Sequence, residues 1–398
     1  MKVTTDKIVN EKLSAAIFIQ FTVLTIQHLV LKYFGLEGSG AETYIKLFSK
    51  LIVGIFFIRT IFDIYYREYK LIIFIYIFSA TIFLINVLLF PQNINELKSI
   101  LFDFFIMCLP CFLFSFSIDN YDHLLNTLKK HGRLIFIVGI FMSYLIIFKN
   151  LNIGSNNYSM SLSYYLLIPS LIYLYYFLKD YTFLNFLLFV FSTIGILLIG
   201  ARGPILCIVV YIIVFIFNNI RGYNSKGRLM FYLASIFIFC IGIIFFNDII
   251  YLVSKVLDYF NIYSRTINFL LNDTFNLSER EKLYFGAFQL IREHPLIGIG
   301  IAGDRLYFQG YVHNLFLELI LNYGIILGFS FSIMLIYIFA KSIISVDKET
   351  SNFNLIFICL GVIPLMFSSS YLVNVWFWIY LGLILKTIFK FNKRNYSL

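Results

Sequence analysis

Long apolar runs recur along almost the whole of this sequence of 398 residues, and they restrict its fold more than any other feature. A helix needs about 20 apolar residues to cross a hydrocarbon core of about 30 Å. Because backbone polar groups in lipid must bond within their own segment, each run predicts a helix. The runs lie at 13–33, 45–62, 71–90, 99–117, 134–149, 162–178, 183–200, 203–218, 229–247, 313–340, 353–369 and 373–389.

The sequence therefore predicts an all-α, polytopic integral membrane protein with about 12 transmembrane helices. Its composition agrees, because 60% of the residues are hydrophobic, 20% are aromatic and the mean hydropathy is +0.87. These values lie far outside the composition of soluble globular domains. A soluble enzyme or binding module is excluded.

The positions of lysine and arginine predict the orientation, because basic residues near span ends stay on the cytoplasmic side. They occur at the N-terminus, in every second connection and after the last span, whereas the connections 34–44, 91–97, 150–161 and 370–372 contain none. Both termini are therefore predicted to be cytoplasmic. Most of the net charge of +10 follows from this topology, so a nucleic-acid partner is not predicted.

Three regions follow from the spacing of the runs. Residues 1–247 hold spans one to nine, residues 248–312 form a large extracytoplasmic loop, and residues 313–398 hold spans ten to twelve. The loop carries most of the outward-facing charged residues, so we expect the functional chemistry there and on the helix that follows it.

Within that loop, the stretch 279–293 is predicted to form an amphipathic helix. Leu283, Ala287 and Leu290 fall on one face of it, and Pro295 ends it soon afterwards. The same helix has Arg280 in its first turn, where a positive charge opposes the helix dipole. This unfavourable placement is a weak indication of a functional demand, against the alternative of a solvated charge.

Two motifs resemble known signatures but lack their structural context. The CLPC sequence at 108–111 has the C-x-x-C spacing of redox enzymes, yet it lies within a predicted span and favours packing. The GIGIAG sequence at 298–303 fits G-x-G-x-x-G but does not lie between a strand and a helix of a βαβ unit. We expect flexible turns there, not a dinucleotide site.

A short outward connection, ARGP at 201–204, predicts an anion site. Pro204 suits the start of a helix, whose unpaired N–H groups favour a negative charge, and Arg202 stands directly before it. The alternative is an arginine that reaches lipid headgroups from a span end. A basic residue in an outward connection runs against the sorting elsewhere in the chain, which favours the functional interpretation.

The start of span ten concentrates polar residues. His313 stands at the membrane entry, and Asn314, Glu318 and Asn322 then repeat every four residues, on one helical stripe. A carboxylate two turns into a span is costly in lipid, so the stripe is predicted to face the bundle interior or a wet cavity. Asp304 and Arg305 precede it in the sequence. Gln27, His28 and Lys32 at the end of span one and Asp103 at the start of span four fall at the same depth.

These residues form motifs that resemble the O-antigen polymerase and O-antigen ligase superfamily. The motifs are RGP at 202–204, S-x-R at 278–280, EHPLIGIGIAGDR at 293–305 and YVHNLFLELILNYGIILG at 311–328. The resemblance implies about twelve helices, a large external loop and an architecture like that of type C glycosyltransferases. It implies undecaprenyl-diphosphate-linked oligosaccharides as donor and acceptor, with no cofactor, no nucleotide sugar and no metal ligands. The sequence departs from the family pattern at Leu327, where a second glycine often stands.

By that resemblance, Arg202, Arg280 and Arg305 would bind the diphosphate, and His313 would act near the acceptor hydroxyl. Positive charge is needed where a departing diphosphate develops negative charge. A neutral imidazole or a carboxylate can accept the hydroxyl proton, so the base is either His313 or Glu318. Asp304 and Asn314 are expected to support the site.

The sequence predicts a polymerase that transfers a growing glycan from its lipid carrier onto a lipid-linked repeat unit, with inversion at the anomeric carbon. The alternatives are a ligase that moves finished polysaccharide to lipid A-core and a flippase of the same lipid. A multi-pass protein of the bacterial inner membrane is expected, with its active site on the outer side, in lipopolysaccharide or capsule biosynthesis. Membrane lipid and a chain-length regulator protein are the further expected partners.

Overall fold

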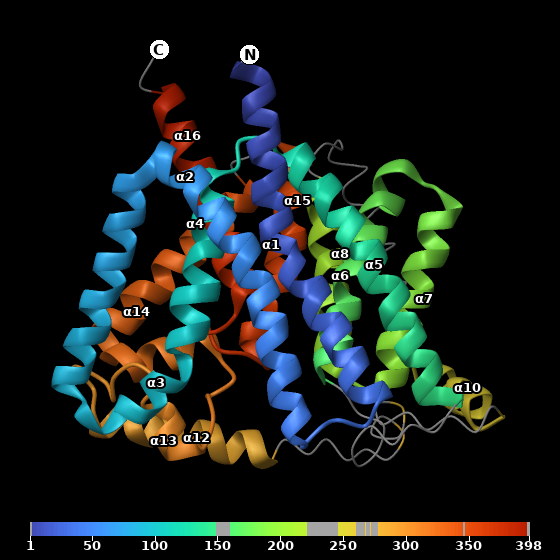
Figure 1. The fold of residues 1–398 in the computed structure, drawn as a ribbon. Helices are drawn as coiled ribbons and strands as arrows, with labels where there is room; N and C mark the ends of the chain where they lie inside the picture. Colours follow the sequence, from blue (N-terminus) through green and yellow to red (C-terminus); the bar gives the residue numbers. More distant parts are fainter. Residues whose placement is uncertain are drawn as a thin grey trace.

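The computed structural model describes residues 2–148, 160–220, 246–259, 267, 271, 278–344 and 347–395. The described residues form helices and turns without any strand, so the all-α prediction is confirmed (Figure 1). Seven described helices are long and apolar enough to cross a membrane, and two more are apolar but shorter. The protein is a polytopic membrane protein. The count of twelve spans stays a prediction, and the ninth predicted span, 229–247, lies almost entirely outside the described residues.

The first two helices already contain three of the predicted spans. Helix α1 is Lys2–Tyr33 and helix α2 is Gly40–Leu89. Helix α2 changes direction at Glu68, where φ is −137° and ψ is 36°. Figure 1 shows α2 running toward the end of the bundle that carries both chain termini and then back again. The predicted spans 45–62 and 71–90 are the two arms of this one kinked helix.

The next span is divided by a wider turn. It comprises η1 (Pro91–Asn93), α3 (Ile94–Phe102), the π-helical segment η2 (Asp103–Cys108) and α4 (Leu109–Ser117). Pro110 lacks an N–H group and its ring crowds the carbonyl four residues earlier, so the regular pattern cannot continue through this point. A π-helical turn relieves that conflict, and it places Asp103 at the start of the wider turn.

A second group of helices packs through small residues. It contains α5 (Tyr121–Phe148), α6 (Met160–Asp180), α7 (Phe183–Ile199) and α8 (Arg202–Ile220). Side chains at Gly139 of α5 and Gly195 of α7 would both collide with Leu166 of α6. Glycine at these positions lets the three backbones approach closely, as small residues do in membrane helices.

The remaining elements build the end of the bundle opposite the termini and then return from it. They are α10 (Phe246–Tyr259), α12 (Ser278–Glu293), α13 (Asp304–Phe308), α14 (Leu315–Ile344), α15 (Lys348–Gly361), η3 (Ile363–Met366) and α16 (Val375–Asn395). Figure 1 shows α10, α12 and α13 together at the end remote from both termini. We call this the loop end and the opposite one the termini end.

Helix α12 is the amphipathic helix that the sequence predicts at 279–293. Ala287 and Leu290 are buried against Ile299, Val312 and Leu321 in a small apolar cluster separate from the main core. The opposite face is exposed. This cluster attaches α12 to the loop that follows it and to the first half of α14, so the outer loop has a core of its own.

The glycine-rich segment docks into a break in α14. Gly324 has φ of 79°, a left-handed value that interrupts the helix. The interruption frees a carbonyl and an N–H, and the segment satisfies both: Ile299 N donates to Leu321 O at 2.8 Å, and Ile325 N donates to Pro295 O at 2.8 Å. The close approach explains the glycines, since a side chain at Gly324 would collide with Leu296 O.

Two asparagines hold the other side of the same segment. Asn86 Oδ1 accepts from Ile301 N at 2.7 Å, and Asn93 Nδ2 donates to Ile299 O at 2.9 Å. Flexible turns were expected for GIGIAG, but hydrogen bonds hold these turns in place, so that the segment forms a strap between α2 and α14. The sequence also has a G-x-x-x-G spacing at 324–328, which in membrane proteins lets a neighbouring helix approach, but the nearest described atoms come from the strap and from α14 itself. Gly328 packs against Ile320 of its own helix, because the break folds the two halves of α14 together.

The cysteines of the CLPC sequence are packing residues. Cys108 and Cys111 are buried, and neither forms a disulfide. Cys111 Sγ accepts from Gln20 Nε2 at 3.0 Å, and Cys108 Sγ lies 3.8 Å from Leu372 O. Inaccessible thiols of this kind lack the exposure that redox chemistry requires.

Candidate functional site

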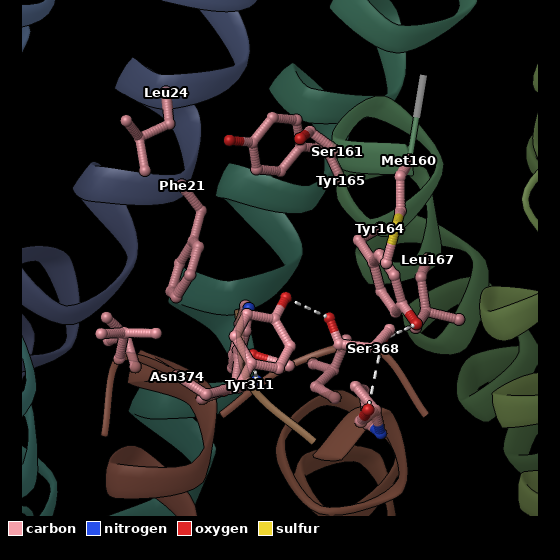
Figure 2. A pocket seen from close by; sticks show the side chains of 16 residues that line it. Phe21, Leu24, Met160, Ser161, Tyr164, Tyr165, Leu167, Tyr311, Ser368 and Asn374 are labelled. Atoms are coloured by element: carbon pink, nitrogen blue, oxygen red, sulfur yellow. Dashed lines mark hydrogen bonds between the residues drawn. The ribbon is translucent and has the colours of Figure 1, made fainter. Parts of the chain in front are cut away.

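Two loops meet at the loop end of the bundle, and they form the centre of the site. One is Tyr311–His313, between α13 and α14, and the other is Phe367–Ser370, between η3 and α16. Tyr311 Oη donates to Ser368 O at 2.9 Å. Ser368 Oγ in turn forms a hydrogen bond with Tyr164 Oη of α6, and Figure 2 shows both bonds meeting at Ser368.

Two of the three predicted arginines converge on the second loop. Arg280, in the first turn of α12, donates from Nη2 to Phe367 O at 3.1 Å and remains exposed. Arg202 is the first residue of α8, and a side chain on the next residue, Gly203, would collide with Tyr164 and Phe367. Helices α8 and α12 therefore begin on the same loop, with an exposed arginine at the start of each.

His313 is close enough to Arg280 to feel its charge, and it has an uncommon backbone conformation. Its φ is 58°, and its ring centroid lies 4.4 Å from that of Tyr311. The ring is half buried, and Nδ1 is buried with no hydrogen-bond partner among the described residues. Burial lowers the pKa of His313, and the charge of Arg280 lowers it further. The imidazole is therefore held in its neutral form, with a nitrogen able to accept a proton.

Asn314 caps a helix. Its Oδ1 accepts from Phe316 N at 3.1 Å and from Leu317 N at 3.2 Å. These bonds satisfy two of the N–H groups left open at the beginning of α14. Asn314 therefore acts through the backbone, by fixing where α14 starts and so where His313 stands.

Asp304 and Arg305 begin α13, and they occupy opposite environments. Asp304 is fully buried, its Oδ2 accepts from Val312 N at 3.3 Å, and its Oδ1 has no partner among the described residues. Burial raises the pKa of Asp304 to about 6, against the charge of Arg305 and the hydrogen bonds that favour the ionised form. Arg305 is half buried, and it lines a cavity with Glu96 and Asp103.

Glu318 lies beneath the site. It is fully buried, and Oε1 accepts from Ser370 Oγ, while Oε2 has no partner among the described residues. On the same stripe, Asn322 Nδ2 donates to Tyr371 Oη at 3.0 Å. The predicted stripe does face the bundle interior. It contacts the loop between η3 and α16 from below.

Two cavities flank the centre of the site. The larger measures about 580 Å³, and the residues that line it include Arg305, Glu96, Ser99, Asp103 and Gln309. The other measures about 470 Å³ and is lined by aromatic rings and hydroxyl groups, including Tyr164, Tyr165, Trp376, Ser161 and Ser369. Tyr311 and Val373 belong to both walls, so these two residues form the partition. Figure 2 shows Tyr311 at the edge of the aromatic cavity.

The structure brings the predicted residues to one end of the bundle but not into one cavity. Arg280 and the start of α8, which carries Arg202, contact the second central loop, and His313 ends the first. Arg305 lines the neighbouring cavity, and Glu318 is buried in the bundle interior. Of the further polar residues expected at this depth, Asp103 lines the cavity of Arg305. His28 contacts the ring of Tyr165, with centroids 6.4 Å apart.

Sequence reasoning missed the residues that connect these groups. Tyr164, Tyr311 and Ser368 form the hydrogen-bonded centre, and Ser370 binds Glu318. The available signal was the run of three serines at 368–370, between two apolar runs. Hydroxyl groups are common in membrane helices, so this run does not distinguish a site from ordinary packing.

The match to a known family covers part of the site. Residues 187–332 match the family model described as O-antigen ligase. The resemblance predicted from the sequence is confirmed. The O-antigen ligase segment includes α8, α12, α13 and the first half of α14, and so all three arginines, His313 and Glu318. It supports an enzyme role in glycan transfer, of the kind that O-antigen ligases and polymerases perform on lipid-linked sugars.

Comparison with curated proteins and with solved structures finds no match. The O-antigen ligase model ends before the second central loop, so Phe367–Ser370 and the aromatic cavity are features of this chain that the family match does not describe. The match does not distinguish a ligase from a polymerase.

Proposed function

We propose that this protein is a polysaccharide polymerase of the bacterial inner membrane with its active site on the outer side, which transfers a growing glycan from undecaprenyl diphosphate onto a lipid-linked repeat unit. The observation that carries the proposal is the position of Arg202, Arg280 and His313 around two hydrogen-bonded loops, between two cavities. A transfer between two lipid-linked substrates needs two adjacent binding regions and positive charge at their junction.

In the proposed reaction, an acceptor hydroxyl oxygen attacks the anomeric carbon of the donor sugar while the bond from that carbon to the diphosphate oxygen breaks. Arg202 and Arg280 stabilise the departing diphosphate, and Arg305 contributes from the neighbouring cavity. Attack from the opposite face inverts the anomeric centre. The proton of the hydroxyl passes to the ring of His313, which is only half buried and is neutral.

We assign Glu318 a positioning role. Its carboxylate binds Ser370, in the loop that also holds Arg280 through Phe367. A buried carboxylate below the loop can fix the loop without touching a substrate, whereas a base must reach the acceptor hydroxyl. Asp304, through Val312 N, and Asn314, through the start of α14, position the other loop in the same manner.

Substitution of the two candidate bases separates these roles. His313→Gln keeps a hydrogen-bonding side chain but cannot take up a proton at neutral pH, so it should stop chain growth and leave single repeat units. Glu318→Gln retains the hydrogen bond with Ser370 and should be weakened but active. Polymer at the wild-type rate from His313→Gln, together with an inactive Glu318→Gln, would exchange the two assignments. Equal amounts of each variant in the membrane are the control.

A ligase is the second candidate, because the matching family model is described as O-antigen ligase and the match fits either function. Deletion of the encoding gene separates the two functions. Loss of a polymerase leaves lipid A-core with single repeat units, whereas loss of a ligase leaves long polysaccharide on its lipid carrier and bare lipid A-core. Long carrier-linked chains in the deletion strain would therefore replace the polymerase proposal with the ligase.

A further inference from the structure

A third cavity lies at the termini end, remote from the two loops of the candidate site. It measures about 660 Å³ and lies between α1 and the beginning of α5, which pack along each other (Figure 1). Four of the side chains that line it are cationic, namely Lys7 of α1 and Lys129, Lys130 and Arg133 of α5, against the carboxylate of Glu11. The cavity therefore carries an excess of positive charge.

Other cations of the termini end take part in ion pairs. Lys12 binds Asp63 at 3.2 Å and Lys386 binds Asp119 at 2.8 Å. By contrast, Lys130 and Arg133 have no salt bridge with any side chain that the structure describes. Cations that serve only to set topology need no concave arrangement, and these surround a cavity large enough for a headgroup.

The surface below the cavity fits the chains of a lipid. Leu134, Ile137, Phe141 and Tyr144 continue along α5 at helical spacing, and each is about half exposed. Lys130 stands one turn before Leu134, and Arg133 stands one turn before Ile137, so both cations lie on the side of the helix that carries the ridge. A molecule with a phosphate at one end and hydrocarbon chains at the other would therefore contact the cations and the ridge together.

We propose that this cavity binds the phosphate of an anionic glycerophospholipid from the membrane leaflet at the termini end. Lys130 and Arg133 bind the phosphate oxygens, with the guanidinium able to contact two of them, and the acyl chains lie on the exposed ridge of α5. His131 has one ring nitrogen engaged, because Nδ1 lies 2.8 Å from Thr22 Oγ1, which leaves Nε2 for the headgroup. The inference is independent of the proposed glycan transfer.

The test uses the purified full-length chain in detergent, with phosphatidylglycerol as the probe and native mass spectrometry as the measurement. The double variant Lys130→Gln/Arg133→Gln removes two exposed cations of the cavity. The matched control, Lys341→Gln/Lys348→Gln, removes two cations of the same end outside it. We expect the first to weaken lipid binding roughly tenfold or more and the second to leave it unchanged.

Two further arms separate the possible ligands. Phosphatidylcholine, whose headgroup has no net charge, should bind the wild type no better than the double variant. Glycerol 3-phosphate, the headgroup chemistry without chains, should not displace phosphatidylglycerol at millimolar concentration. Displacement would replace the lipid with a soluble phosphate compound, and equal lipid binding by all three proteins would remove the site. Should the double variant unfold in the absence of lipid, Arg133→Gln alone serves the same comparison, because that side chain is exposed.

Discussion

The two ends of the helical bundle are stabilised in opposite ways. At the termini end, ion pairs join separate helices, as Lys12 of α1 does with Asp63 of α2 and Lys179 of α6 does with Glu349 of α15. At the loop end, between Asp304 and Asn322, polar groups are buried without partners. Five of the seven such atoms in the described residues lie there, on Asp304, Arg305, His313, Glu318 and Asn322.

The backbone shows the same contrast. Among the described residues, three of the four non-glycine residues with a left-handed φ, namely Ala302, Gln309 and His313, lie at the loop end, with φ between 52° and 60°, and the fourth is Tyr181 between α6 and α7. Such conformations cost on the order of 1–3 kcal/mol each and persist only when the surroundings fix them. Strain and unpaired polar groups together are typical of sites organised for a ligand and not for stability alone. The comparison supports the proposal that the loop end binds the substrate, whereas ion pairs at the termini end join the helices.

The largest difference between the ends should appear in activity. Arg202→Ala, Arg280→Ala and Arg305→Ala should each reduce polymer formation roughly 100- to 1,000-fold, as loss of a group that stabilises a developing charge does. Lysine at these positions should restore part of the activity, since it keeps the charge without the planar fork.

The controls for this experiment are Lys341→Ala and Lys348→Ala at the termini end, which should form polymer like the wild type. Chain-length profiles of the polysaccharide, at matched protein level in the membrane, provide the measurement. Wild-type profiles from all three arginine variants would remove the diphosphate role and the contrast in function with it.

The second difference concerns glycine. Gly324→Ala should destabilise the protein by about 2–4 kcal/mol, because the left-handed φ and the collision with Leu296 O act together. Gly54→Ala is the matched control, since Gly54 lies within α2 with no atom near the added methyl group. Alanine there should be neutral or slightly stabilising. Thermal unfolding in detergent measures both, and a neutral Gly324→Ala would show that the strap does not need the break in α14.

The third difference concerns the pH dependence of the reaction. Because burial and Arg280 lower the pKa of His313 below 6.5, the free base should persist at mildly acidic pH. The rate of the purified enzyme should therefore decline only as pH falls below 6.5. The His313→Gln variant should lose most of its activity, and its remaining rate should not show this decline. If the rate of the wild type already declined around a pH above 7, proton transfer would be assigned to another group.

The smallest difference concerns two aspartates with opposite pKa shifts. Burial raises the pKa of Asp304 to about 6, so the ionised form is disfavoured in the folded state. Relative to Asp304→Asn, the wild type should lose stability as pH rises from 3.8 to about 6. At Asp347, partial burial raises the pKa by less than the hydrogen bonds with Thr350 lower it.

Asp347→Asn should therefore change stability in the opposite direction. The stabilisation that Asp347 provides is present above pH 3.8 and is lost as pH falls below that value. Unfolding temperatures of both variants across this range give the comparison. If the effect on unfolding temperature changed with pH in the same direction for both variants, the environments described for the two aspartates would be contradicted.

The sequence predicted the class of fold, and it predicted that the candidate site residues gather at one end of the bundle, because both depend on patterns along the chain. Apolar runs define helices in a membrane, and α12 was recognisable from its apolar face. The kinks were not predictable in this way. Glu68 and Gly324 bend helices whose apolar runs continue on both sides, and the bend at Gly324 depends on a strap that comes from elsewhere in the chain.

Residue roles were harder to predict than residue positions. Asn314 and Glu318 share the stripe of a helix, but one caps that helix and the other binds Ser370 from a distant loop. Helical spacing reports which residues face the same way and says nothing of the partner they meet. The position of Ser370 depends on the short hairpin between η3 and α16, whose depth in the bundle follows from packing and not from hydropathy.

Two hydrogen bonds join the strap to α14, and we call this pair the clasp. The clasp limits where the chain between the strap and α14 can gain residues. The hydrogen bonds of Ile299 with Leu321 and of Pro295 with Ile325 close a ring of chain at its base. Asp304, His313 and Glu318 all lie inside the ring. Residues inserted near Gly310, far from the clasp and with open space beside it, would enlarge the ring without opening it. A single residue inserted between 295 and 299 would shift one bond against the other, so the segment can grow at its tip but not at its base.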